Sequence, residues 1–291
     1  MIYEVSHRTV YRYSQAVSIS HHLLHLTPRD GGFQACRDTA VEIAPPPSVR
    51  APGVDYFGNP TTFVTIQQNH VELVLHALSS IEIADRPIPN AAATPSWEAV
   101  RGQALNDRSP EALEALEFTF ASPYVPLVAE LRAYAADSFP PGRPILEGAR
   151  ELTHRIFTDF TYEPGATTLG TGVVRAFAMR RGVCQDFAHI QIACLRALGL
   201  PARYVSGYLL TRPAEGKERM VGADASHAWL SIWVPGHDWV DLDPTNDLIP
   251  GREHITIGWG RDYGDVSPVS GVMFGGGAHE VTVAVDVLAA G

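Results

Sequence analysis

From residue 2 to residue 85, apolar and polar positions follow the two-residue period of β-strands. Short runs rich in β-branched and aromatic residues are separated by turn signals, such as Pro28 to Gly32, Pro45 to Pro47 and Gly58 to Pro60. Such regularly interrupted runs are typical of antiparallel sheets that bury one face. The pattern predicts a β-rich, sandwich-like N-terminal domain over residues 1–85.

The pattern changes over residues 86–109. Three prolines (Pro87, Pro89 and Pro95) lie here among small polar residues, without a hydrophobic period. Proline and small polar residues favour irregular backbone, and a stretch without periodicity offers no face to bury. The segment is therefore predicted to be a linker or a long loop.

Helical spacing begins at Ser109-Pro110, where a capping serine precedes a first-turn proline, and it recurs at 124–137 and 145–159. Further helices and then strands follow, up to an alternating tail at 280–287. This order of elements predicts an α+β fold for residues 110–291, a core domain that includes the C-terminal strands.

The composition is that of a globular protein: 45% of the 291 residues are hydrophobic and 19% are charged, with 22 basic and 32 acidic side chains and a net charge of −10. Disorder is thereby excluded as the main state. The acidic balance argues against nucleic acid or an anionic membrane as a partner, because either would require clustered Lys and Arg. The chain shows neither a secretory signal nor an apolar run of membrane-spanning length, so a cytoplasmic location is expected.

Cys184 is the first candidate for chemistry. Residues 173–181 are predicted to form a helix closed by Gly182, and a second helix is predicted from Cys184 to the stop signals at Gly199 and Pro201. The unpaired amides and positive dipole of a helix N-terminus favour a thiolate, so Cys184 is a candidate nucleophile. Cys36 and Cys194 are expected to be structural.

A thiolate nucleophile needs an imidazole partner and a third group that orients the imidazole. His227 begins a strand-like segment and shares one face of it with Trp229. Asp241 and Asp243 lie on one face of the next strand, and the residues alone do not decide between them. A tight turn at 235–238 would place Asp243 about three residues too far from His227, so a bulge or a longer loop is expected.

These segments carry a resemblance to a known family. The chain contains Gly-Val-Cys-Gln-Asp-Phe-Ala-His around Cys184, then Ser-His-Ala-Trp at 226–229 and Asp-Pro-Thr-Asn at 243–246. Together they resemble the papain-like core of the transglutaminase-like superfamily, most of all its bacterial cysteine proteases. The likeness extends to the N-terminal domain through Asp55-Tyr-Phe-Gly-Asn59 and to the segment 258–265. The resemblance implies a triad of Cys184 as nucleophile, His227 as acid and base, and Asp243 as orienting carboxylate.

Animal transglutaminases use a tryptophan upstream of the nucleophile in the oxyanion hole, and this chain has none there. Tyr162 is the expected replacement donor, with Gln185 next to the nucleophile as an alternative. Trp229 is expected to complete the substrate shell.

No cofactor or metal is expected. Zinc held by His21, His22 and His25, or by Cys184 with His189 and His227, is a weaker alternative, because neither set provides a convincing four-ligand pattern.

The sequence thus predicts a thiol-dependent hydrolase that cleaves a peptide, isopeptide or other amide bond through a thioester acyl-enzyme. A transglutaminase that transfers glutamine acyl groups to amines is the first alternative, because both reactions share the acyl-enzyme. A non-catalytic binding module is the second. The expected partner is a peptide or protein amide substrate, and the sequence leaves the oligomeric state open.

Overall fold

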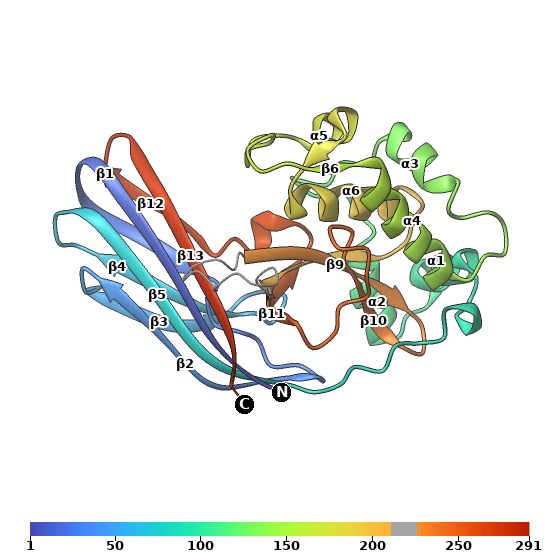
Figure 1. Ribbon diagram of the computed structural model, residues 1–291, viewed down its shortest axis with the longest axis horizontal. Coiled ribbons are helices and arrows are strands. Elements are labelled where there is room, and N and C mark those ends of the chain that lie inside the picture. The colour runs from blue at the N-terminus through green and yellow to red at the C-terminus, as the bar shows by residue number, and fades with distance from the viewer. Residues whose placement is uncertain (211–225, 291) are drawn as a thin grey trace, which may run out of the picture.

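The computed structural model describes residues 1–210 and 226–290 (Figure 1). A β-rich N-terminal half lies beside a half in which helices cover a smaller sheet. The N-terminal strands are β1 (Ile2–Leu24), β2 (Gln34–Ala44), β3 (Val49–Val54), β4 (Pro60–Ile66) and β5 (His70–Ile83). The β-rich fold predicted for this region is confirmed.

The long strand β1 organises the N-terminal half because its two ends have different neighbours. Up to Arg12 it pairs with β5, and from Ser20 it pairs with β4. The two ends therefore belong to two half-sheets, and the apolar faces of these strands enclose a buried core that includes Val17, Val64 and Leu73. A bent strand shared in this way closes the sandwich-like layer without a separate connection.

The C-terminal strands complete this same sheet. β13 (His279–Ala290) pairs with the first part of β1, and β12 (Val269–Gly275) pairs with the second part. The prediction that these strands belong to the core domain is therefore wrong. Period-2 alternation marks a strand but does not identify its partner, and the free side of β1 is filled here by the opposite end of the chain.

The helices of the second half begin earlier than predicted. η1 (Ala91–Ala93) and α1 (Trp97–Asn106) lie inside the segment 86–109 that was expected to be a linker or loop. The Ser96 side chain accepts a hydrogen bond from the backbone N–H of Ala99, so α1 has a true N-cap. The helix was missed because it buries only Val100 and Ala104, a stripe too narrow to give a visible period.

The remaining helices follow the predicted order. Ser109 caps α2, and Pro110 occupies its first turn, as the sequence indicated. These helices are α2 (Pro110–Glu117), α3 (Ala129–Ala136), α4 (Ile145–Asp159), α5 (Val173–Met179) and α6 (Cys184–Ala197). No helix in the described ranges has both the length and the apolar character needed to cross a membrane.

The helices pack on a four-stranded antiparallel sheet with the strand order β10-β9-β8-β11. Its strands are β8 (Ala202–Leu209), β9 (Ser226–Val234), β10 (Asp238–Leu242) and β11 (His254–Gly260). Ala228, Leu230 and Ile232 of β9 share a buried core with residues of α6, such as Ile190. The central helix α6 therefore rests on the strand that carries His227.

A separate apolar cluster joins the two halves. Tyr3 and Ile81 of the N-terminal sheet pack with Tyr208, Ile255 and Ile257 of the core sheet. All five side chains are at least 96% buried. Because these apolar side chains are removed from water, they stabilise the contact between the two halves.

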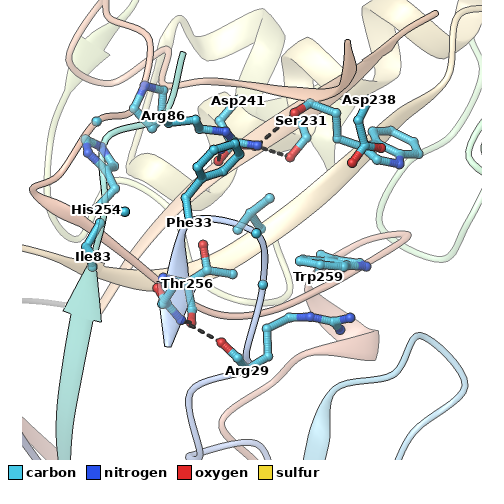
Figure 2. A pocket seen from close by; sticks show the side chains of 18 of the residues that line it. Arg29, Phe33, Ile83, Arg86, Ser231, Asp238, Asp241, His254, Thr256 and Trp259 are labelled. Carbon is cyan, nitrogen blue, oxygen red and sulfur yellow. Dashed lines mark hydrogen bonds and ion pairs between the residues drawn. The ribbon is translucent and has the colours of Figure 1, made fainter. Parts of the chain in front are cut away.

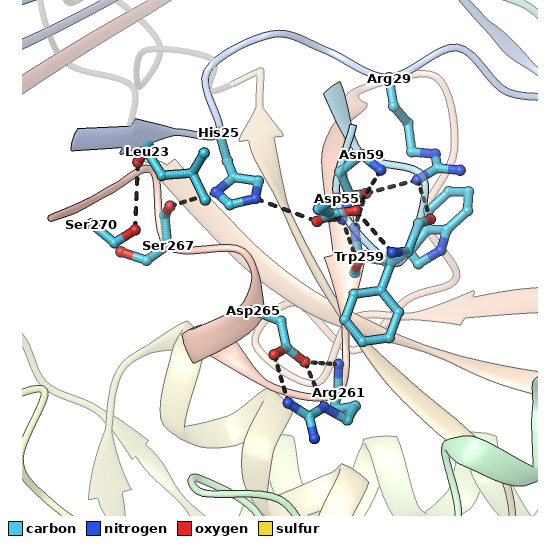
Figure 3. Close-up of polar contacts among 11 residues, drawn as sticks. Leu23, His25, Arg29, Asp55, Asn59, Trp259, Arg261, Asp265, Ser267 and Ser270 are labelled. Carbon is cyan, nitrogen blue, oxygen red and sulfur yellow. Dashed lines mark hydrogen bonds and ion pairs between the residues drawn. The ribbon is translucent and has the colours of Figure 1, made fainter. Parts of the chain in front are cut away.

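Polar contacts fix the same junction (Figure 3). The Asn59 amide pairs with the backbone of Trp259, donating to its carbonyl at 2.8 Å and accepting from its N–H at 3.0 Å. A Cβ atom on Gly258 would lie 2.8 Å from Oδ1 of Asn59, so this approach requires glycine. Two of the segments that carry the family resemblance, 55–59 and 258–265, therefore meet here.

Candidate active site

Cys184 is the first residue of α6, as predicted, and a short parallel pairing brings Tyr162 beside this end of the helix. β6 (Thr161–Tyr162) pairs with β7 (Arg181–Gly182), with Tyr162 opposite Gly182. The helix before it is closed by Arg180 in the left-handed conformation, not by Gly182 as expected. Gly182 instead accommodates Asp186, since a Cβ atom there would lie 2.6 Å from its Oδ2 atom.

Asp186 stabilises the start of α6. Its Oδ2 atom accepts the backbone N–H of Val183 at 2.9 Å and the hydroxyl of Thr167 at 2.6 Å. An acidic side chain in the first helical turn also interacts favourably with the helix dipole. The backbone that carries Cys184 is thereby held in one conformation.

The three residues of the expected triad lie together. Nε2 of His227 lies 2.7 Å from Oδ2 of Asp243, and the thiol of Cys184 is a further hydrogen-bond partner of the imidazole. Because Nε2 faces the carboxylate, Nδ1 is the ring atom available to the thiol. His227 and Asp243 are buried, whereas Cys184 is partly exposed, as access to a substrate would require.

The hairpin that positions Asp243 differs from the expected one. β9 and β10 pair without a register shift, with Leu242 opposite Leu230, so the predicted bulge is absent from this pairing. Asp243 comes directly after Leu242, so continuation of this register makes it the diagonal neighbour of His227 on the same face. A diagonal neighbour is within reach of a side chain, so no bulge is needed.

The environment of His227 favours its charged form. Burial alone would lower its pKa, but hydrogen bonds to Asp243 and Cys184 and the charges of these two groups raise the pKa to about 10. Burial would likewise raise the pKa of Asp243, but its hydrogen bonds with His227 and His254 hold the pKa well below the usual value. The arrangement is therefore suited to an imidazolium beside a permanently ionised carboxylate.

Asp241 has other partners. Its Oδ2 atom lies 2.5 Å from a guanidinium nitrogen of Arg86 and accepts the indole N–H of Trp229 at 3.2 Å, and its Oδ1 atom accepts the hydroxyl of Ser231. Within the described residues, its carboxylate makes no hydrogen bond to His227. Of the two aspartates that the residues alone left open, Asp243 is the one that contacts His227.

The three expected shell residues lie in different environments. Tyr162 is 51% exposed, and its pKa is raised by burial of part of the ring and by the charge of nearby Cys184. Gln185 follows the nucleophile and is partly exposed. Trp229, in contrast, has no exposed surface. The expectation that it lines the substrate site is wrong, since its indole packs beneath His227 with ring centroids 6.0 Å apart.

Two further residues complete the site, and sequence reasoning missed the role of both. His254 places Nε2 3.0 Å from Oδ2 of Asp243, and the Asn246 amide donates to the same oxygen at 2.7 Å. Asn246 belongs to the Asp-Pro-Thr-Asn segment, so its proximity to Asp243 was the available signal. His254 lies at the start of the next strand, 11 residues after Asp243, and no local pattern indicated it.

In the described part of the chain, His227, Asp243 and His254 also form a group that could hold a metal ion, with ligand atoms within 4.8 Å of one another. Both imidazoles and the Asn246 amide share the one oxygen Oδ2. A metal would have to displace the N–H protons that now bind this oxygen, because a ligating imidazole nitrogen carries no proton.

The other cysteines and His189 differ from this site. Cys194 is fully buried and Cys36 partly so, and in both cases burial raises the thiol pKa. His189 is buried, stacks on Tyr124 and accepts the backbone N–H of Tyr263. These contacts support the structural roles expected for all three.

Comparison with known proteins identifies the relatives of this chain. Residues 3–82 match the bacterial transglutaminase-like N-terminal region, and residues 132–244 match the transglutaminase-like superfamily. An uncharacterized protein of Mycobacterium tuberculosis is 42% identical over 98% of this chain and 92% of its own length. A second, from Mycobacterium leprae, is 32% identical over 97% of each chain.

Two further similarities concern proteins with a described activity. A protein-glutamine gamma-glutamyltransferase of Pseudomonas aeruginosa is 36% identical, but over only 35% of this chain and 16% of its own length. The crystal structure of a "putative cysteine protease" from Cytophaga hutchinsonii covers 99% of this chain and 90% of its own, with a TM-score of 0.78 and 20% identity. That likeness shows a shared fold across both halves. From the full-length relatives and the two matched regions, the chain belongs to the transglutaminase-like superfamily, in its bacterial form with a β-rich N-terminal region.

Proposed function

We propose that this protein is a cysteine hydrolase that cleaves a peptide, isopeptide or other amide bond. The observation that carries the proposal is the continuous contact from Cys184 through His227 to Asp243, on a partly exposed thiol at a helix N-terminus. Membership of the transglutaminase-like superfamily supports it, because the same three segments carry the likeness.

In the proposed reaction, the Cys184 thiolate attacks the amide carbonyl and forms a tetrahedral oxyanion. The His227 imidazolium donates its Nδ1 proton to the leaving amine, and a thioester remains on Cys184. The neutral ring then accepts a proton from water as the water attacks the thioester. The acid product is released, and the Cys184 thiolate and the His227 imidazolium are regenerated. Asp243 holds Nε2 throughout and stabilises the cation.

The oxyanion needs donors close to Cys184. Backbone amides at the start of α6 are available there, and we propose the Tyr162 hydroxyl as the second donor. The position of Tyr162 opposite Gly182, together with its electrostatic interaction with Cys184, supports this assignment. Gln185 is the alternative.

A transferase is the second candidate, and the similarity to the Pseudomonas glutamyltransferase favours it. The two reactions differ only in the nucleophile that attacks the thioester. Incubation with a peptide library in ¹⁸O-labelled water, with and without a fluorescent primary amine, distinguishes them by mass spectrometry. A hydrolase introduces ¹⁸O into a new carboxylate, whereas a transferase attaches the amine. If neither product forms, both enzymatic proposals fail and the non-catalytic binding module is favoured.

The matched control is Cys184→Ala. Cys184 is a partly buried residue at the edge of the main core, so its loss should leave cooperative unfolding intact while it abolishes either product. Product formation by Cys184→Ala would contradict the proposal.

A further inference from the structure

A cavity of about 160 Å³ lies between the N-terminal half and the core sheet (Figure 2). Arg29, Phe33 and Ile83 line it from the N-terminal side, and His254 and Trp259 of β11 line it from the core. His254 connects the cavity to the candidate active site, because its Nε2 atom contacts Asp243. The cavity itself is not lined by Cys184 or His227.

Arg203 is the most unusual residue of this cavity. Its Cζ atom lies 4.2 Å from the ring centroid of Trp239 and 3.8 Å from that of Trp259. Cζ of Arg29 lies 3.4 Å from the centroid of Trp259, so the two guanidinium groups must occupy opposite faces of that ring. Stacking on aromatic faces holds both cations in place but leaves their N–H groups in the ring plane free to donate.

Nη1 of Arg29 donates to the Phe57 carbonyl at 2.9 Å and to Oδ1 of Asn59 at 2.7 Å, but the Nε donor of each arginine lacks an acceptor among the described residues. Arg203 is only 5% exposed, and within the described residues its buried Nε atom has no hydrogen-bond partner; the same is true of Nε of Arg29. Burial lowers the pKa of Arg203 to about 9, so the group remains charged at neutral pH. A buried donor without an acceptor is unfavourable, and an anionic ligand would supply the missing acceptor.

His254 contributes a different function to the cavity. The ionised Asp243 carboxylate can only accept hydrogen bonds, so Nε2 of His254 must carry the proton. In the neutral ring, Nδ1 is then an acceptor. His254 is 7% exposed, and its Nδ1 atom is buried without a partner among the described residues. The cavity therefore offers cationic donors together with one acceptor.

The charges favour a ligand with one carboxylate group. Arg86 lines the cavity but is neutralised by Asp241 at 2.5 Å, and Asp238 lies at the exposed side. Among the described residues, Arg203 and Arg29 remain as the cations whose Nε–H group has no acceptor. A volume of about 160 Å³ is close to that of an engineered cavity of about 150 Å³ that holds benzene, so a ligand of a few heavy atoms fits.

We propose that this cavity is a binding site for a small carboxylate that also carries a hydrogen-bond donor, either a hydroxy acid or an amino acid. Its carboxylate accepts from Arg203, with Arg29 adding positive charge, and its hydroxyl or ammonium group donates to Nδ1 of His254. The assignment does not depend on the proposed hydrolysis, since it concerns a separate cavity and no covalent step.

Equilibrium dialysis with four radiolabelled compounds of nearly equal size tests the site. These are lactate, alanine, propionate, which lacks the donor, and lactamide, which lacks the charge. Full-length protein with the substitution Cys184→Ala is used, so that no turnover interferes. Lactate or alanine should bind at least tenfold more tightly than propionate and lactamide, and the tighter of the two identifies the donor as hydroxyl or ammonium. Equal binding of all four compounds, or of none, would overturn the proposal.

Two substitutions in the same background separate the two contacts. Arg203→Gln should weaken binding of the preferred acid at least tenfold, whereas Arg132→Gln, at an exposed arginine outside the cavity, should not change it. His254→Phe keeps a ring but removes the acceptor, so the preference over propionate should disappear. If Arg203→Gln does not unfold cooperatively, Arg29→Gln replaces it. Unchanged binding and preference in the folded variants would refute the site.

Discussion

Asp243 contacts His227 across the hairpin: its Oδ2 atom lies 2.7 Å from Nε2, although Asp243 follows the last paired residue of β10, Leu242, which lies opposite Leu230. The same oxygen also binds His254 and Asn246, while Oδ1 accepts the backbone N–H of Thr245. The carboxylate is thus fixed by several donors at once. This rigidity allows it to hold one imidazole orientation.

The first prediction compares the two aspartates of this hairpin. Asp243→Asn should lower kcat by about 10³–10⁴, because an amide permits the wrong imidazole tautomer. Asp241→Asn should change kcat less than tenfold, since Asp241 contacts Arg86 and Ser231 rather than His227. It should instead reduce the free energy of unfolding by about 1–3 kcal/mol. Steady-state kinetics and chemical denaturation of both variants measure this, and the reverse order of kcat would assign the orienting role to Asp241.

The second prediction concerns pH. The raised pKa of His227, about 10 against 6.5 for a free imidazole, keeps the ring protonated through neutral pH. kcat/KM should therefore remain high up to about pH 9 and fall as the pH rises through about 10, where the acid that protonates the leaving amine is lost. The contribution of this charged ring to folding should be complete below about pH 6.5 and disappear over the same alkaline range.

The matched measurement uses Asp243→Asn. Loss of the carboxylate removes a main cause of the raised pKa, so the alkaline limb of the residual activity should move to lower pH. An unchanged limb in this variant would show that another group controls it.

The third prediction tests the proposed oxyanion donor. Tyr162→Phe retains the ring, which contacts Phe187, but removes the hydroxyl. Loss of one preformed oxyanion donor lowers kcat by a factor of about 10²–10³. The melting temperature should hardly change because Tyr162 is half exposed. Tyr56→Phe, at a 77% exposed tyrosine, is the control and should retain parental kcat. If Tyr162→Phe also stays within a few-fold of the parent, Gln185 becomes the candidate donor.

The fourth prediction concerns the strand beneath the site. Gly207 lies opposite His227, and a Cβ atom there would be 2.1 Å from the carbonyl oxygen of Ile255 and 2.5 Å from the Trp229 ring. Gly207→Ala should therefore destabilise the protein by about 1–3 kcal/mol or more, as overpacking does. Gly102→Ala, in helix α1 with no atom within 4 Å of the added Cβ, should be neutral or stabilising. Thermal unfolding compares them, and equal melting temperatures would contradict the packing described.

Much of this fold could be predicted because local signals coincide with the elements. Ser109 and Pro110 do mark the start of α2, and Cys184 does begin α6. The partners of the C-terminal strands could not be predicted, because alternation is the same for any sheet that buries one face. Helix α1 was missed because its buried stripe consists of only two residues.

In the candidate site, too, residues with local sequence signals could be predicted and residues that depend on tertiary contacts could not. Cys184 and His227 each lie in a segment with a recognisable pattern, so they could be selected from the residues, whereas the choice of Asp243 over Asp241 came from the family resemblance. His254 could not, because its contact with Asp243 depends on the pairing of β11 with β8 and of β8 with β9. The burial of Trp229 is also a tertiary property, since strand alternation assigns a face but not what covers it.

The most direct test of the central claim is the reactivity of the three cysteines. Native protein is treated briefly with iodoacetamide at neutral pH, and peptide mass mapping gives the alkylation rate at each position. Cys184 should react at least tenfold faster than Cys36 and Cys194, whose thiol pKa values are raised by burial, and His227→Gln should remove this advantage. Preferential labelling of Cys36 or Cys194, or an unchanged Cys184 rate in His227→Gln, would contradict a thiol activated by His227.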